Sequence, residues 1–102
     1  MRDDCTVFAA PEEGIVLELF KEVELMTKHL ILDMRDLTSI SEFCISKCKE
    51  AKAQLNRKSL SLVLVLSEHF IQELPQILSV APTLVEAYDV VELEEMERDL
   101  GF

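Results

Sequence analysis

Residues 77–100 read ILSVAPTLVEAYDVVELEEMERDL, and this stretch joins a strand signal to an acidic helix signal through a proline. Proline lacks a backbone N–H and favours an extended conformation in the residue before it, so a strand over Ile77–Val80 should end there. Thr83 then occupies a helix N-cap position, and Glu86, three residues later, completes a capping box. The stretch therefore predicts a strand followed by a helix over Leu84–Asp99.

The rest of the chain alternates between strand-like and helical patterns. Short runs of β-forming or apolar residues predict strands at Cys5–Ala10, His29–Met34 and Ser59–Leu66. Apolar residues spaced three and four apart predict helices at Ile15–Met26 and Ile40–Leu55. A short helical turn is expected at Glu68–Glu73, because Pro75 stops it. Such alternation builds a mostly parallel sheet covered by helices, with the most apolar strand, Ser59–Leu66, at its centre.

The size and charge of the chain limit what it can bind. A chain of 102 residues should form a single domain over residues 1–102, and its 49% of hydrophobic residues suffice for one core. The formal net charge of −10 opposes binding to nucleic acid or to an anionic membrane surface, and it suits a protein partner with a basic groove. A plainer interpretation of this charge is that it keeps the protein soluble.

The first residues, the longest apolar run and the cysteines all indicate a cytoplasmic location. The opening MRDDC is acidic and lacks an apolar segment, so we expect no signal peptide. No apolar run approaches the roughly 20 residues that a membrane helix needs. The three cysteines form an odd number without the spacing of a disulfide framework, which fits a reducing compartment.

Several of these elements match one known family: LILDMRDL at 30–37, a helix that starts near Ser41, LSLVLVL at 60–66, and the closing block at 77–100. With these blocks the chain resembles a STAS domain (sulfate transporter and anti-sigma-factor antagonist), and it is most similar to small free-standing bacterial members with an acidic C-terminal helix. The resemblance implies an α/β fold with a mixed sheet of roughly four to five strands flanked by three to four helices. It also implies a non-enzymatic switch, in which an anti-sigma-factor kinase phosphorylates one hydroxyl at the start of the second helix. The unphosphorylated domain then binds that kinase.

The chain departs from the family pattern at the phosphorylated motif. The family's Asp-Ser-Ser-Gly-like motif falls on Ser41-Glu42-Phe43-Cys44, which places Glu42 at the position of the phosphorylated hydroxyl. A glutamate carries a permanent charge of about −1 and imitates a phosphate, with about −1.5 to −2, only in part. We therefore expect an anti-sigma-factor antagonist-like regulator that is not phosphorylated at the usual site. Its expected partner-binding surface consists of Thr38, Ser39, Ser41, Glu42 and Phe43.

Two further interpretations of this segment stay open. Ser39 and Glu42 have the spacing of a capping box, in which Ser39 would be the N-cap of the helix. Thr38, Ser39 and Ser41 are also candidate phosphate acceptors, although hydroxyls before a helix mainly serve as caps.

Asp33, at the end of the second predicted strand, suggests the phosphoacceptor of a response-regulator receiver as an alternative. Such a site also needs an acidic pair after the first strand, to hold magnesium, and a lysine after a later strand. The first strand here ends in Ala9-Ala10-Pro11 and not in an acidic pair. The strand predicted at Ile77–Val80 is followed by Ala81-Pro82 and not by a lysine. We therefore favour a role in which Asp33 orders the next loop by accepting hydrogen bonds from backbone amides.

The sequence predicts no enzyme activity, cofactor or metal. The only glycines are Gly14 and Gly101, which excludes a phosphate-binding glycine loop. Cys44 and Cys48 lie four residues apart on one helix face, but a structural metal site needs about four ligands and no histidine has a matching position. We expect both cysteines to be buried in the core.

The last helix is apolar on two sides. Leu84, Ala87, Tyr88 and Val91 should pack on the sheet. A second seam consists of Val90, Leu93, Met96 and Leu100, spaced three and four apart. This seam predicts a homodimer or a contact with another protein, unless it belongs to a wide core face.

Overall fold

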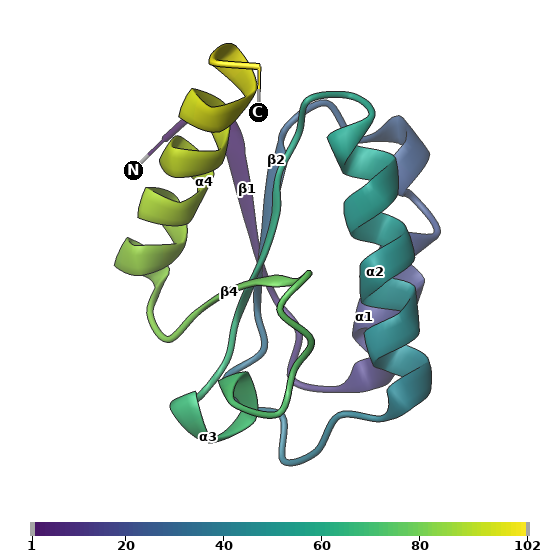
Figure 1. Ribbon diagram of the computed structural model, residues 1–102. Helices are drawn as coiled ribbons and strands as arrows, with labels where there is room; N and C mark the ends of the chain where they lie inside the picture. Colours follow the sequence, from purple (N-terminus) through teal and green to yellow (C-terminus); the bar gives the residue numbers. More distant parts are fainter. Residues whose placement is uncertain (1, 102) are drawn as a thin grey trace.

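A computed structural model describes residues 2–101, and Figure 1 shows one sheet between two layers of helices. The strands are β1 (Cys5–Ala9), β2 (His29–Asp33), β3 (Leu62–Val65) and β4 (Ser79–Ala81), and they lie in the order β1-β2-β3-β4. In this register Ile31 of β2 is opposite Val63 of β3. Because β3 pairs with both β2 and β4, the prediction of a central strand within Ser59–Leu66 is confirmed.

The predicted α/β class is confirmed, with four strands and four α-helices in the described part of the chain, residues 2–101. The pairs β1–β2, β2–β3 and β3–β4 are all parallel, whereas the resemblance implied a mixed sheet. Each strand reaches its neighbour through a crossover that contains a helix, and such a connection brings the chain back to the edge where the previous strand began. Within residues 2–101, all strands therefore run in one direction.

The helices divide between the two faces of the sheet. Helices α1 (Glu13–Phe20) and α2 (Glu42–Asn56) cover one face, and α4 (Leu84–Asp99) covers the other (Figure 1). The remaining helix, α3 (Glu68–Ile71), is a short turn between β3 and β4, as Pro75 predicted. Among residues 2–101, no helix is both long enough and apolar enough to cross a membrane.

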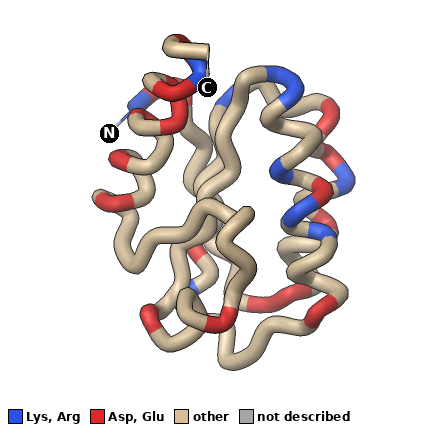
Figure 2. The backbone as a smooth tube through the Cα atoms, in the orientation of Figure 1, with Lys and Arg blue, Asp and Glu red and all other residues tan. Residues whose placement is uncertain are grey.

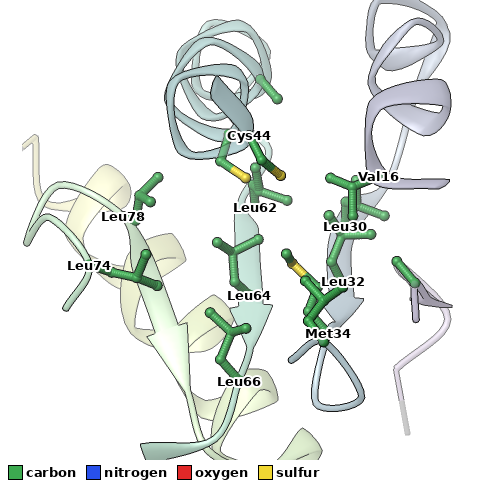
Figure 3. Close-up of a cluster of buried hydrophobic side chains, with 14 of the residues drawn as sticks. Val16, Leu30, Leu32, Met34, Cys44, Leu62, Leu64, Leu66, Leu74 and Leu78 are labelled. Carbon is green, nitrogen blue, oxygen red and sulfur yellow. The ribbon is translucent and has the colours of Figure 1, made fainter. Parts of the chain in front are cut away.

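The alternation of side chains along the strands divides the core into two clusters. The cluster on the side of α1 and α2 includes Val16, Leu30, Leu32, Cys44, Leu62 and Leu64 (Figure 3). The other cluster joins Ile31, Val63 and Val65 to Ala87 and Val91 of α4. Strands β2 and β3 are therefore buried on both faces, which explains why their sequences are almost continuously apolar.

The helix predicted at the end of the chain has the expected start. The Thr83 Oγ1 accepts a hydrogen bond from the Glu86 backbone N–H at 3.1 Å, and α4 spans Leu84–Asp99. The strand before it is displaced: β4 begins at Ser79, and Ile77 is 63% exposed. The cause is a turn before the strand, in which the Leu78 N–H donates to the carbonyl oxygen of Pro75 at 3.1 Å.

The helix predicted over Ile15–Met26 is wrong in its second half. Helix α1 ends at Phe20, and a 3₁₀ helix, η1 (Val23–Leu25), follows before β2. The Lys58 Nζ donates hydrogen bonds to the carbonyl oxygens of Val23 at 3.0 Å and Met26 at 3.1 Å. These carbonyl groups thus have a partner outside a regular helix, so the chain can turn toward β2 without leaving them unsatisfied.

Candidate partner-binding surface

The predicted partner-binding residues lie together on the segment that joins β2 to the first turn of α2. They are Thr38, Ser39, Ser41, Glu42 and Phe43, and all are exposed. The segment passes along the end of the molecule where β2 finishes and α2 begins, at the bottom of Figure 1. We call these residues the α2-entry surface.

The N-cap of α2 is Ser41, so the predicted capping box between Ser39 and Glu42 is wrong. The Ser41 Oγ accepts a hydrogen bond from the Cys44 backbone N–H at 3.1 Å, and the Ser41 backbone is extended, with ψ of 159°. The Ser41 backbone N–H donates to the Glu13 carboxylate at the start of α1. This contact with α1 holds Ser41 at the point where α2 begins, and it leaves Ser39 outside the helix.

Glu42 is the first residue of α2, and its side chain is exposed. The backbone N–H groups of a first helical turn lack helical acceptors, and the positive end of the helix dipole lies there, so a negative charge is favourable at this position. Within residues 2–101, the Glu42 carboxylate forms no ion pair. It is therefore available to a basic group of a partner.

Phe43 is 60% exposed and borders a groove between α1 and α2. The groove has a volume of about 520 Å³, and its lining includes Leu17, Phe20, Phe43, Lys47 and Ala51. The Lys47 Nζ lies 5.4 Å from the centroid of the Phe43 ring, so a cation lies over the ring face. The sequence predicted Phe43 as a surface residue but not the groove, because the residues of α1 that face α2 are decided by packing.

Asp33 orders the loop that leads to the α2-entry surface, as predicted. Its Oδ1 accepts hydrogen bonds from the Arg35 backbone N–H at 3.2 Å and from the Arg35 Nε at 2.9 Å. Its Oδ2 accepts from the Arg35 Nη2 at 2.8 Å. The side-chain hydrogen bonds from Arg35 hold the pKa of Asp33 below its ordinary value. The guanidinium therefore occupies both carboxylate oxygens, a contact that the sequence analysis missed.

Cys44 and Cys48 are buried free thiols, so the prediction that they belong to the core is confirmed. A side-chain hydrogen bond with Cys44, together with burial, raises the pKa of the Cys48 thiol. A thiol with a raised pKa is mostly protonated and a poor nucleophile.

A polar cluster that the sequence did not predict surrounds His29, at the start of β2. The His29 side chain is 6% exposed, and its Nε2 lies 3.1 Å from the Glu95 carboxylate on α4 and 3.8 Å from that of Asp4. Its Nδ1 accepts a hydrogen bond from the Ser61 backbone N–H at 2.9 Å, so the neutral ring carries its proton on Nε2. The Arg2 Nη2 lies 2.6 Å from Asp4 and 2.7 Å from Glu95.

This His29 cluster has a poor donor set for a metal ion. The ligand atoms of Asp4, His29 and Glu95 lie within 4.8 Å of one another. A protonated Nε2, however, offers no lone pair, and the Arg2 guanidinium already pairs with both carboxylates. We describe the cluster as a structural network that attaches α4 to β2. Its only sequence signal was a histidine at the start of an apolar strand.

A second polar network joins α2 to α4 beside β4. The Lys52 Nζ donates a hydrogen bond to the Ser79 Oγ at 2.7 Å. The Ser79 hydroxyl in turn donates to the Glu94 carboxylate, which lies 3.7 Å from the Lys52 Nζ. The acids of α4 that face the sheet, Glu94 and Glu95, thus both have basic partners.

Comparison of the chain with models of known protein families gave no match, and comparison with curated proteins gave none. What supports a function is accordingly the arrangement of the residues themselves, together with the resemblance in the sequence.

Proposed function

We propose that this protein is a non-enzymatic, cytoplasmic regulator that binds another protein through the α2-entry surface, in the manner of a bacterial STAS-domain anti-sigma-factor antagonist. The observation that carries the proposal is the 60% exposed ring of Phe43, which lies on the first turn of α2 between the Glu42 charge and the groove beside α1. The buried Cys44 and Cys48 anchor the same helix in the core, so the ring projects from a fixed support. An exposed aromatic ring provides binding energy, and a neighbouring charge selects a partner of opposite sign.

In this proposal Glu42 makes the surface permanently negative at the position where the family carries a phosphorylated hydroxyl. Its charge of about −1 is smaller than that of a phosphate, so the protein would resemble the phosphorylated state only in part. Regulation through phosphorylation at this position is then absent. The exposed hydroxyls of Thr38, Ser39 and Ser41 are the remaining candidate acceptors on the α2-entry surface.

We propose no catalytic role for Asp33. Both of its carboxylate oxygens accept hydrogen bonds from Arg35, and among residues 2–101 Asp33 belongs to no group of three or more side chains that lie close enough to share a metal ion. Incubation with acetyl phosphate and magnesium, followed by mass spectrometry, tests this directly. We expect an unchanged mass, whereas an added phosphoryl group that is lost in Asp33→Asn would favour a receiver.

Capture of the partner is the first experiment on the regulator function. The tagged protein is used to isolate its partner from the native cytoplasm, and mass spectrometry identifies what binds. Recovery of a histidine-kinase-like ATPase would support an anti-sigma-factor partner. Recovery of only the protein itself would favour a dimerisation module.

The captured partner then allows a test of the charge at Glu42. Glu42→Ser restores a hydroxyl and should change the affinity by about tenfold, because it removes a charge from the interface. The matched control is Glu24→Ser, which changes an exposed glutamate in η1, just before β2 begins. An affinity that is the same for wild type and both variants would argue against the α2-entry surface.

A second candidate is an interaction through α4. Of the predicted seam, Leu93, Met96 and Leu100 are 55%, 54% and 68% exposed, whereas Val90 is partly buried against the core. The exposed residues are free to contact a second copy of the chain, as the sequence suggested, or another protein. Light scattering over a range of concentrations distinguishes these cases, because a homodimer doubles the mass.

A further inference from the structure

The outer side of α4 carries an apolar stripe. Its residues are Val85, Leu93, Met96 and Leu100, which are 72%, 55%, 54% and 68% exposed. They follow one another at spacings of eight, three and four, which places them on one side of the helix. With a rise of about 1.5 Å per residue, this α4 outer stripe is about 22 Å long, enough for about four turns of a second helix.

The charged residues along the α4 outer stripe are all negative. Exposed acids flank or interrupt it: Glu86, Asp89, Glu92, Glu97 and Asp99. In the part of the chain that the structure describes, none of them forms an ion pair, in contrast to Glu94 and Glu95 on the sheet side. Figure 2 shows mostly acids along α4, with basic residues at its C-terminal end and at the start of the chain, while many of the other lysines and arginines lie along α2 and the loop after it. The stripe therefore lies in a negative potential that its neighbours leave largely unbalanced.

We propose that the α4 outer stripe binds an amphipathic helix with a basic polar face, supplied by another protein. Apolar side chains spaced three and four apart on that helix would pack against Leu93, Met96 and Leu100. Lysines or arginines on its flanks would pair with acids such as Glu92 and Glu97. Because the α4 outer stripe lies on the other face of the sheet from α2, this binding is independent of the function proposed above for the α2-entry surface, and it gives the second candidate a specific partner (Figure 1).

A second copy of the chain fits the α4 outer stripe less well than a basic helix. In a two-fold dimer the same patch of each subunit meets its counterpart. Rows of acids such as Glu92 and Glu97 would then face rows of acids, which is unfavourable. An anionic membrane surface is disfavoured by the same charges.

Fluorescence anisotropy on the full chain tests this proposal with a synthetic probe. The probe is a labelled peptide of about 18 residues, or about five helical turns, with leucines spaced three and four apart and lysines elsewhere. One control peptide has the same composition in scrambled order, and another has glutamate in place of each lysine. We expect saturable binding of the leucine–lysine helix, binding at least about tenfold weaker for the scrambled peptide, and none for the glutamate peptide.

Matched variants then locate the binding site. Leu93→Ser with Met96→Ser should weaken binding by about tenfold or more. Glu92→Gln with Glu97→Gln should weaken it several-fold and reduce its dependence on salt. The controls Leu25→Ser and Glu22→Gln with Glu24→Gln change an exposed leucine and exposed acids near η1, and they should bind as wild type does. Circular dichroism verifies that every variant is folded.

Several results would overturn the proposal. These are failure of the leucine–lysine helix to bind, equally tight binding of the scrambled peptide, and equal losses in the α4 variants and their controls. A homodimer of the free chain that Leu93→Ser with Met96→Ser dissociates would identify a second copy as the occupant instead.

Discussion

His29 of β2 and Glu95 of α4 are 66 residues apart in the sequence, and the imidazole Nε2 lies 3.1 Å from the carboxylate Oε2. On its other side, the ring accepts the Ser61 backbone N–H at 2.9 Å. The nearly buried His29 side chain thus connects its own strand, β2, to Ser61 just before β3 and to helix α4.

Replacement of His29 by leucine should therefore destabilise the protein. The change leaves the buried Ser61 N–H without an acceptor and the Glu95 carboxylate without one of its donors, so the free energy of unfolding should fall by about 1–3 kcal/mol. Urea denaturation followed by circular dichroism measures this loss. The control is His69→Leu on the exposed turn α3, which should change stability by less than about 0.5 kcal/mol. Similar losses for both histidines would contradict the role of the network.

The two serines before α2 provide a second test. Ser41→Ala removes the acceptor of the Cys44 backbone N–H and should lower the free energy of unfolding by about 1 kcal/mol. Ser39 is also exposed but lies outside the helix, so Ser39→Ala should have almost no effect on the same measurement. A larger loss for Ser39→Ala than for Ser41→Ala would show that the helix is capped by Ser39.

Acid should destabilise the protein through Asp33 and Glu95. The hydrogen bonds from Arg35 lower the pKa of Asp33. Burial raises the pKa of Glu95, but the hydrogen bonds from Arg2 and His29 outweigh it and lower that pKa as well. The ordinary pKa values are 3.8 for Asp33 and 4.5 for Glu95, so the unfolded chain binds protons more readily than the folded protein does. The stabilisation is therefore complete above about pH 5 and is lost as the pH falls through the lowered pKa values.

Urea denaturation between about pH 7 and about pH 3 measures this dependence. The wild type should lose stability with falling pH, and Asp33→Asn should lose less because one of the responsible carboxylates is absent. An Asp33→Asn variant with the same pH dependence as the wild type would show that Asp33 is not involved.

The sequence predicted the elements whose signals are local. Strands β2 and β3 were recognisable because both of their faces are buried, which demands an apolar residue at almost every position. The start of α4 was recognisable because Thr83 caps the helix through a neighbouring backbone N–H, that of Glu86. The exposure of the α2-entry surface was also predictable, since polar residues precede an amphipathic helix there.

Features that depend on distant residues were not predictable. Ser39 and Ser41 are both serines, so residue type alone does not tell which of them caps α2. Ser41 is held at the start of the helix by a hydrogen bond from its backbone N–H to Glu13, which is 28 residues away. The apolar spacing of the first helix continues beyond Phe20, but Lys58, far along the chain, binds the carbonyl groups where that helix has ended. Likewise, neither the strand pattern around His29 nor the helix pattern around Glu95 indicates that these two side chains are in contact.

Binding of a protein partner at the start of α2 is measured best by isothermal titration calorimetry, with the captured partner titrated against the wild type and two variants. Phe43→Ser removes the ring that is 60% exposed beside the groove, and Leu25→Ser removes an apolar side chain that is 81% exposed in η1. We expect Phe43→Ser to weaken binding by about tenfold or more and Leu25→Ser to match the wild type. Equal affinities for all of these proteins would contradict binding at the α2-entry surface.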